Sequence, residues 1–203
     1  MNMINDLMHV APVIPVIVIE DEAHAVPLAE ALVAGGLRVL EVTLRTPAAL
    51  PAIRAMKQVE GAIVGAGTVT NTHELDAALA AGSEFIVSPG LTEPLGRAAI
   101  ASGVPFLPGV ANAGDIMRGL DMGLKRFKFF PAMAAGGLPA LKALAAPFGN
   151  VRFCPTGGIG PDNAAEWLAF DPVLCVGGSW VSPKGAPDKP LIEKLAREAF
   201  GLR

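Results

Sequence analysis

A lysine lies in the middle of an otherwise apolar run, Arg126-Phe-Lys-Phe-Phe-Pro131, that has the composition of a β-strand. Burial among phenylalanine side chains removes water from an ammonium group and favours the neutral amine. A neutral amine is a nucleophile toward ketones, so Lys128 is a candidate for Schiff-base formation. Phe130 follows two residues later and is expected on the same side of the strand. The competing interpretation is a lysine whose ammonium group reaches water past the end of the strand.

A carboxylate, a hydroxyl and a guanidinium alternate along a second apolar run, at Glu41, Thr43 and Arg45. Residues two apart point to the same face of an extended strand, so these side chains are expected to lie together. A carboxylate in such a group can transfer protons, and a guanidinium can bind a substrate carboxylate. The alternative is a Glu–Arg ion pair that only lines the end of the strand.

Small residues end three other strand-like runs. The run Gly65-Ala-Gly-Thr68 would let a ligand approach the backbone closely, and Thr68 adds a hydroxyl. The last two runs of the chain end in Thr156-Gly-Gly158 and Gly177-Gly-Ser179. Paired glycines expose backbone N–H groups that can bind a phosphate, although tight turns use glycine as well.

Metal-binding residues are not grouped in the sequence. The histidines, His9, His24 and His73, fall at predicted helices or their starts, and no His/Asp/Glu cluster has the spacing of metal ligands. Cys154 and Cys175 lie in separate runs without a C-x-x-C motif, and both are expected to be buried and reduced. The sequence therefore predicts a site that needs neither a metal nor another cofactor.

The elements that would position these residues alternate regularly along the chain. The predicted strands are 13–19, 39–44, 62–68, 85–88, 104–108, 126–130, 151–155 and 174–178. The predicted helices are 4–9, 23–34, 47–59, 72–81, 93–102, 113–122, 138–146, 162–169 and 191–200. Several helices end in glycine just before the next strand, and such repeated units imply a parallel sheet.

Eight strand–helix units in 203 residues predict the α/β class, with a single (β/α)8 TIM-barrel domain spanning 1–203. The carboxyl ends of the strands in this fold form one face, where the residues above would meet. The alternative is an open doubly wound sheet. That fold usually carries a glycine fingerprint after the first strand, where this chain has Ile19-Glu-Asp-Glu22.

The composition narrows the set of partners. The net charge is −3 and no long basic run occurs, so nucleic acid is not expected as a partner. The longest apolar run, 10–19, contains two prolines and is too short to span a bilayer, and the N-terminus does not read as a signal peptide. We therefore expect a cytoplasmic protein that does not bind a membrane.

Six runs together carry a resemblance to a known family. They are Val39-Leu-Glu-Val-Thr-Leu-Arg-Thr46, Val64-Gly-Ala-Gly-Thr68, Ser88-Pro-Gly-Leu-Thr-Glu93, Arg126-Phe-Lys-Phe-Phe-Pro-Ala132, Val151-Arg-Phe-Cys-Pro-Thr-Gly-Gly158 and Cys175-Val-Gly-Gly-Ser-Trp180. Spanning nearly the whole chain in this order, they closely resemble the class I aldolases of the 2-keto-3-deoxy-6-phosphogluconate (KDPG) and 4-hydroxy-2-oxoglutarate (KHG) family. Its members are TIM barrels and typically trimers.

The resemblance implies a carbon–carbon lyase of carbohydrate metabolism. The reaction would cleave the phosphorylated keto acid of the Entner–Doudoroff pathway to pyruvate and D-glyceraldehyde 3-phosphate, and KHG to pyruvate and glyoxylate. Carried over by position, it makes Lys128 the Schiff-base lysine and Glu41 the general acid/base. The matching substrate-binding positions are Arg45 and Thr68 for the carboxylate, Phe130 near the lysine, Thr156 for stereochemical control, and Gly157, Gly158 and Ser179 for the phosphate, with Pro89 as a further substrate-binding position.

The chain departs from the family pattern in two places. Met133 stands where relatives often have Glu, and Ala111-Asn-Ala113 stands where others have Ser or Thr. Other interpretations are an aldolase for the galactonate-derived epimer, a metal-free phosphosugar epimerase or synthase with Glu41 as base, and a phosphosugar-binding module without activity.

Overall fold

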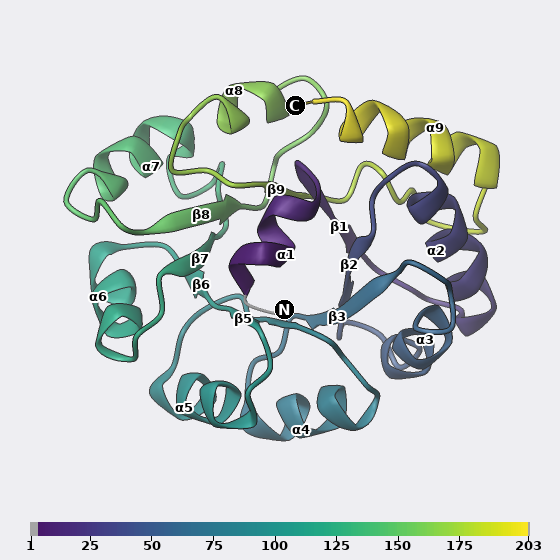
Figure 1. The fold of residues 1–203 in the computed structure, drawn as a ribbon, viewed down its shortest axis with the longest axis horizontal. Coiled ribbons are helices and arrows are strands. Elements are labelled where there is room, and N and C mark those ends of the chain that lie inside the picture. The colour runs from purple at the N-terminus through teal and green to yellow at the C-terminus, as the bar shows by residue number, and fades with distance from the viewer. Residues whose placement is uncertain (1–3, 203) are drawn as a thin grey trace.

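The strands of the protein curl into a closed parallel barrel inside a ring of helices, in a computed structural model that describes residues 4–202 (Figure 1). The strands are β1 (Val13–Ile17), β2 (Val39–Thr43), β3 (Ile63–Gly67), β4 (Ile86–Val87), β5 (Phe106–Leu107), β6 (Gly109–Val110), β7 (Arg126–Phe129), β8 (Arg152–Pro155) and β9 (Val176–Gly178). Residues 1–3 and 203 of the predicted domain lie outside the described part of the chain.

Hydrogen bonding runs around the barrel in the order β5-β4-β3-β2-β1-β9, and β6-β7-β8 form the remaining wall. β5 and β6 are two halves of the fifth barrel strand, interrupted at Pro108, where the chain changes its pairing from β4 to β7. Isolated bridges, including Thr156 to Gly177, join β8 to the β9 side. The predicted (β/α)8 TIM barrel is therefore the fold observed.

The helices follow the strands in alternation. They are α1 (Ile4–Val10), the short 3-10 helix η1 (Glu22–His24), α2 (Ala25–Ala34), α3 (Ala49–Met56), α4 (Thr72–Ala80), α5 (Glu93–Ser102), α6 (Ala113–Asp121), α7 (Gly137–Ala145), α8 (Ala164–Leu168) and α9 (Lys189–Phe200). The order of α2 to α9 around the ring follows the chain (Figure 1). Among residues 4–202, none of these helices has the length and apolar character that a membrane span requires.

Side chains alternate between the two faces of each strand. On β2, Leu40 and Val42 pack outward with the helices, while Val39 belongs to an inner cluster. The buried members of this inner cluster are Leu7, Met8, Ile14, Val39, Phe85, Val87, Leu107, Cys154 and Cys175. Since Glu41 and Thr43 share the face of Val39, they also point into the lumen.

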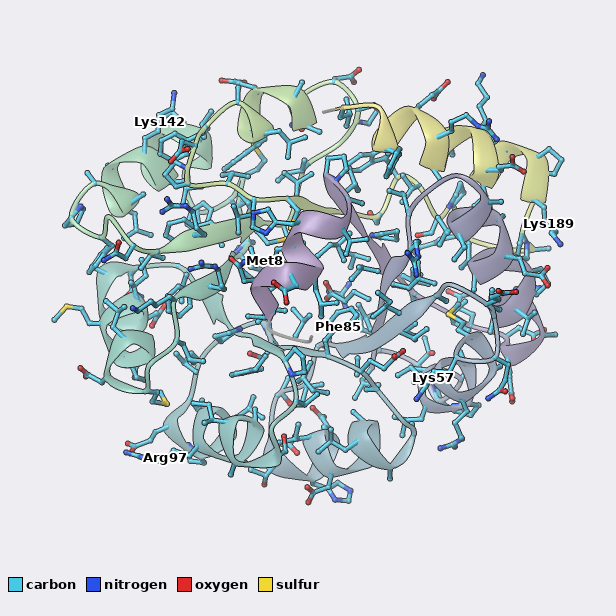
Figure 2. The ribbon with its side chains drawn as sticks, in the orientation of Figure 1. Met8, Lys57, Phe85, Arg97, Lys142 and Lys189 are labelled. Atoms are coloured by element: carbon cyan, nitrogen blue, oxygen red, sulfur yellow. The ribbon has the colours of Figure 1, made fainter. Side chains whose placement is uncertain are left out.

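Helix α1 covers the N-terminal end of the barrel. It lies over the centre of the ring, and its Met8 is seen close to Phe85 in the middle of the molecule (Figures 1 and 2). The Arg126 guanidinium of β7 donates a hydrogen bond to the Asn5 side chain of α1 at 2.7 Å. Apolar side chains thus fill the lumen at the N-terminal end, and on β2 the charged side chain of Glu41 follows Val39 toward the other end.

Candidate active site

Lys128 and Glu41 form an ion pair inside the barrel. The distance between Lys128 Nζ and Glu41 Oε1 is 2.9 Å, and the two side chains are only 7% and 3% exposed. β2 and β7 are four strands apart in the eight-stranded barrel, so the pair spans the lumen between opposite walls. The ammonium group is therefore held inside the protein and does not reach water past the strand end.

Two neighbours shape the surroundings of this pair. Gly67 on β3 leaves room for the carboxylate, because a Cβ atom at this position would lie 2.2 Å from Glu41 Oε1. The ring of Phe130 has its centroid 5.5 Å from Lys128 Nζ, within the range of a cation–π contact. An alanine at position 67 would displace Glu41, so this glycine is needed for the pair to form.

Arg45 is placed by the loop that follows β2. Its Nε donates a hydrogen bond to Thr68 Oγ1 at 3.3 Å. Thr68 has a φ of 61°, a left-handed conformation that is costly for a β-branched residue and that occurs preferentially at functional sites. On either side of Arg45, the Thr43 hydroxyl donates to Ile17 O at 2.8 Å and the Thr46 hydroxyl donates to Ile19 O. Thr43 therefore anchors β2 to the end of β1. Glu41 pairs with Lys128, so the alternative of a Glu–Arg ion pair is not the arrangement observed.

A cleft of about 580 Å³ opens at the carboxyl ends of the strands, a size typical of small-molecule sites. Its lining combines residues that the sequence predicted for binding with others that it did not. The first are Arg45, Phe130, Thr156, Gly157, Gly158, Ser179 and, from the second glycine run, Gly177, and the others are Val16, Val18, Ile159, Ser182, Pro183 and Lys184. Lys128 and Glu41 are buried and do not line this cleft, but the ring of Phe130 both lines it and contacts Lys128.

The paired glycines have a structural reason to be there. Gly157 and Gly158 have φ values of 105° and 74°, which favour glycine over any residue with a side chain. A Cβ atom at Gly177 would lie 2.2 Å from the Thr156 hydroxyl. The glycines after β8 and β9 therefore shape the wall of the cleft and bring its backbone close to any ligand.

Pro89 lies beside the lysine strand and outside the lining of the cleft. A Cβ atom at Gly109 would lie 2.1 Å from Pro89 O, and Gly109 is the register partner of Lys128. The Ser88 hydroxyl donates to Gly90 O at 2.6 Å and closes the turn around Pro89. The role of Pro89 in substrate binding stays a prediction.

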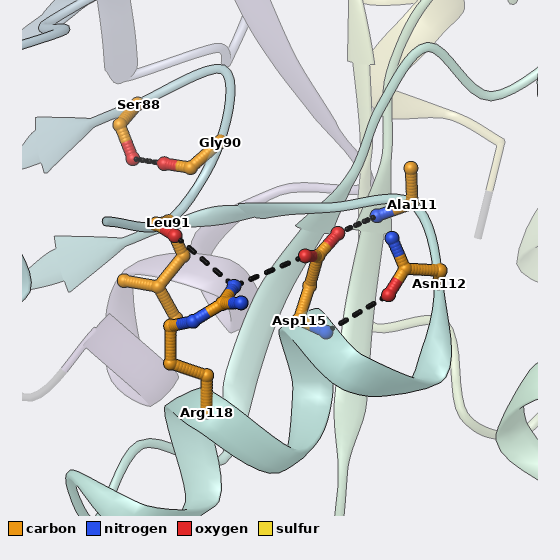
Figure 3. Close-up of polar contacts among 7 residues, drawn as sticks. All are labelled: Ser88, Gly90, Leu91, Ala111, Asn112, Asp115 and Arg118. Carbon is orange, nitrogen blue, oxygen red and sulfur yellow. Dashed lines mark hydrogen bonds and ion pairs between the residues drawn. The ribbon is translucent and has the colours of Figure 1, made fainter. Parts of the chain in front are cut away.

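The two departures from the family pattern lie next to the site. Met133 is 48% exposed and packs on the glycine turn, since a Cβ atom at Gly158 would lie 2.7 Å from its Cγ. Asn112 begins α6 by accepting a hydrogen bond from the Asp115 N–H, while the Asp115 carboxylate accepts one from the Ala111 N–H (Figure 3). Asn112 therefore has a capping role that accounts for its presence.

No group of three or more His, Cys, Asp and Glu side chains that could hold a metal ion occurs among residues 4–202. The histidines fall where the sequence placed them, in α1, η1 and α4. Cys154 and Cys175 are buried and not joined in a disulfide.

Comparisons with known proteins agree with this geometry. The family model for KDPG and KHG aldolase matches residues 4–197. The 2-dehydro-3-deoxy-phosphogluconate aldolase of Zymomonas mobilis is 63% identical over 203 residues, which are 100% of this chain and 98% of that protein. The KHG/KDPG aldolase of Escherichia coli is 56% identical over 197 residues, which are 95% of this chain and 92% of that protein.

Solved structures share the fold closely. The crystal structure of the Z. mobilis ZM4 aldolase with 3-phosphoglycerate has a TM-score of 0.97 at 62% identity and covers 98% of this chain and 96% of its own. The KDPG aldolase from Legionella pneumophila, with pyruvate captured as a covalent carbinolamine, has a TM-score of 0.95 at 46% identity and covers 98% and 99%. The family model, the identity to relatives over the whole chain and the shared fold together show that the chain belongs to the KDPG and KHG aldolase family.

Proposed function

We propose that Lys128 carries the aldolase activity of this chain by forming a Schiff base with the C2 keto group of KDPG. The observation that carries this proposal is the buried pair of Lys128 and Glu41, 2.9 Å apart beside a cleft of small-molecule size. The covalent carbinolamine of pyruvate in the L. pneumophila relative supports an amine nucleophile, because a carbinolamine is the adduct of an amine and a ketone.

The reaction begins when Glu41 accepts a proton from the Lys128 ammonium group, and the neutral Nζ then attacks C2 of the keto acid. Glu41, at 2.9 Å, takes up and returns protons as the carbinolamine loses water and becomes an iminium ion. The iminium ion then acts as an electron sink. Glu41, or a water molecule that it activates, removes the C4 hydroxyl proton, and the C3–C4 bond breaks as its electron pair moves into the enamine.

The products leave in two steps. D-Glyceraldehyde 3-phosphate departs first, since bond cleavage leaves only the three pyruvate carbons attached to Lys128. The enamine is then protonated at C3, and hydrolysis of the resulting iminium ion releases pyruvate and regenerates the amine. Because Glu41 is the carboxylate paired with Lys128, it serves the proton transfers around the reacting carbons, directly or through a water molecule.

The cleft supplies groups for both ends of the substrate. Arg45, held by Thr68, can grip the carboxylate with two parallel hydrogen bonds. Thr156, whose hydroxyl lies against Gly177, would contact C4 and distinguish its two configurations. Gly157, Gly158 and Ser179 form the phosphate end, which the 3-phosphoglycerate complex of the Z. mobilis relative supports.

The proposal also covers the domain organisation, oligomeric state and cellular location of the protein. Residues 1–203 form one domain, and the enzyme acts as a metal-independent homotrimer in the cytoplasm. The trimer rests on the resemblance to the family. A second substrate is KHG, which the name of the E. coli relative supports.

Pyruvate release, measured by coupling to lactate dehydrogenase, tests the function. We expect the highest kcat/KM for KDPG, with lower values for KHG, which lacks a phosphate, and for the C4 epimer. A protein that binds KDPG without releasing pyruvate would be a binding module. Release of an isomerised sugar without pyruvate would instead indicate an epimerase.

A further inference from the structure

A lysine from the β9–α9 loop lines the cleft in addition to the residues already assigned. Lys184 and Arg45 are the only ionisable side chains in the lining that the structure describes, and both are cations. Arg45 faces the carboxylate of the substrate in the proposed function, which leaves Lys184 as a second charge for a second anionic group.

The loop that carries Lys184 is tied to the proposed phosphate end. The Ser182 N–H donates a hydrogen bond to Ser179 O at 3.1 Å, and the Ser182 hydroxyl donates to the same oxygen at 3.4 Å. These bonds fix the backbone at Ser182, and Lys184 follows two residues later. Gly185, which follows Lys184, has a φ of 95°, a conformation that favours glycine. The lysine lines the cleft together with Ser179 and the two glycines.

The ammonium group of Lys184 is free to bind a ligand. It forms no ion pair with any residue in the described range 4–202. Lys184 also lines a small neighbouring crevice together with Glu20 and His24, and it forms no ion pair with this carboxylate. An exposed lysine acts as a mobile point charge, which suits a phosphate dianion.

We propose that Lys184 is a specificity-determining residue that favours phosphorylated over unphosphorylated keto acids through its charge. The backbone N–H groups and Ser179 would orient the phosphate, while Lys184 would supply the charge that they lack. The inference rests on the proposed function. It adds Lys184 as the residue that selects substrates with a phosphate dianion.

The test compares KDPG with 2-keto-3-deoxygluconate, the same keto acid without phosphate. We would measure kcat and KM of the wild type, Lys184→Gln and Lys184→Arg at low and high salt. The matched control is Lys57→Gln, because Lys57 follows α3 on the outer ring and changes the net charge equally (Figure 2). Inhibition of pyruvate release by inorganic phosphate gives a second readout that needs no turnover of the unphosphorylated acid.

Lys184→Gln should lower kcat/KM for KDPG by about 3- to 10-fold, mainly through KM, and weaken phosphate inhibition similarly. Lys184→Gln should leave kcat/KM for 2-keto-3-deoxygluconate unchanged, and Lys184→Arg should keep the wild-type kcat/KM for both substrates. The difference should shrink at high salt, because counterions screen an exposed charge. An equal loss for both substrates, or no loss, would overturn the inference while the aldolase assignment stood. A wild-type protein that cleaves neither substrate would overturn the proposed function itself.

Discussion

Glu41 and Lys128 come from opposite walls of the barrel, and each compensates the charge of the other in a site that water barely reaches. Removing one partner of a buried ion pair leaves the second charge unpaired, which costs about 3–5 kcal/mol. The same two groups are the proposed nucleophile and proton carrier. A substitution at either position therefore affects both stability and chemistry, and the two effects must be measured separately.

Lys128→Met should abolish turnover and lower the free energy of unfolding by about 3 kcal/mol, because Glu41 would stay buried without a cation. The double variant Lys128→Met/Glu41→Gln should regain part of that stability and no activity. Denaturant unfolding and the pyruvate assay measure the two effects, with Lys142→Met as a surface control (Figure 2). Appreciable turnover by a folded Lys128→Met protein would contradict the assignment.

Arg45→Lys should weaken pyruvate binding by roughly 10-fold, because an ammonium group cannot reproduce the two-pronged contact of a guanidinium with a carboxylate. Isothermal titration with pyruvate measures the change. Arg97→Lys on α5 is the matched control, since Arg97 lies on the outer ring (Figure 2). Unchanged affinity would remove Arg45 from the carboxylate site.

Single residues could be predicted from the sequence where spacing alone decides their direction. Glu41 and Lys128 each point inward because they alternate with apolar neighbours on a strand, and burial of the pair is confirmed. The left-handed conformation of Thr68 and the contact between Gly67 and Glu41 depend on two strands meeting, so no local pattern reveals them. Lys184 lies in a loop without periodicity, which gave no signal for its position.

At the scale of elements, two loops after barrel strands end in the same cap. In the β3–α4 loop, Asn71 accepts a hydrogen bond from the Glu74 N–H, and Glu74 accepts bonds from the Thr70 N–H and hydroxyl. The β6–α6 loop repeats the pattern with Asn112 and Asp115 (Figure 3). These reciprocal bonds resemble a capping box and fix the loops that follow the strands.

The cap also connects Arg118 to the turn beyond Pro89. The Arg118 guanidinium lies 3.2 Å from the Asp115 carboxylate and donates a hydrogen bond to Leu91 O at 3.4 Å (Figure 3). The β4–α5 and β6–α6 loops are therefore joined at the mouth of the barrel. Rigid loops of this kind keep the walls of a site in place.

The Glu74 cap predicts a pH-dependent stability. Partial burial raises the pKa of Glu74, but the hydrogen bonds from Thr70 and Asn71 outweigh it, and the net pKa is lowered. A carboxyl group whose pKa is lowered by folding stabilises the protein above its unfolded-state pKa, and this contribution is lost as pH falls through the folded value. Glu74→Gln should therefore cost about 0.5 kcal/mol at pH 7, because water screens part of the effect.

Urea unfolding at several pH values measures this cost. The difference in free energy of unfolding between the wild type and Glu74→Gln should disappear as pH falls below about 4. Glu60→Gln, which removes an exposed carboxylate outside any cap, should show no such difference. A difference that persists in acid would mean that packing, rather than charge, accounts for the loss.

The order and type of the elements could be predicted because each apolar run and each glycine stop is a local signal. The ends of elements were less predictable. The strand predicted at 104–108 is observed only at Phe106–Leu107 (β5), and β6 follows beyond its predicted end, after Pro108; the helix predicted at 47–59 spans Ala49–Met56. Both differences arise from pairing and packing with neighbouring elements, which the local sequence does not record.

At the scale of the whole molecule, the barrel is closed at one end and open at the other. Helix α1 and the inner cluster fill the N-terminal end, and the cleft lies at the carboxyl ends of the strands. The proposed chemistry is thereby confined to one face of the barrel. The extent of the domain, the trimer and the cytoplasmic location stay predictions.

Met8→Ala tests how much the packing of helix α1 on the closed end of the barrel contributes to stability. Met8 is fully buried in the inner cluster, so its truncation should lower the free energy of unfolding by about 2 kcal/mol with little change in kcat. Met117→Ala is the control, because Met117 on α6 is 57% exposed. Equal stability of Met8→Ala and the wild type would show that α1 contributes little to the barrel.

The most direct test of the whole account is intact mass after incubation with pyruvate and sodium borohydride, followed by peptide mapping. Borohydride reduces an iminium ion to a stable secondary amine, so the bond formed during catalysis becomes a permanent mark. The account predicts one pyruvate-derived adduct per chain, on Lys128, and none in Lys128→Met. No adduct, or an adduct on another lysine, would contradict the Schiff-base mechanism proposed for this site.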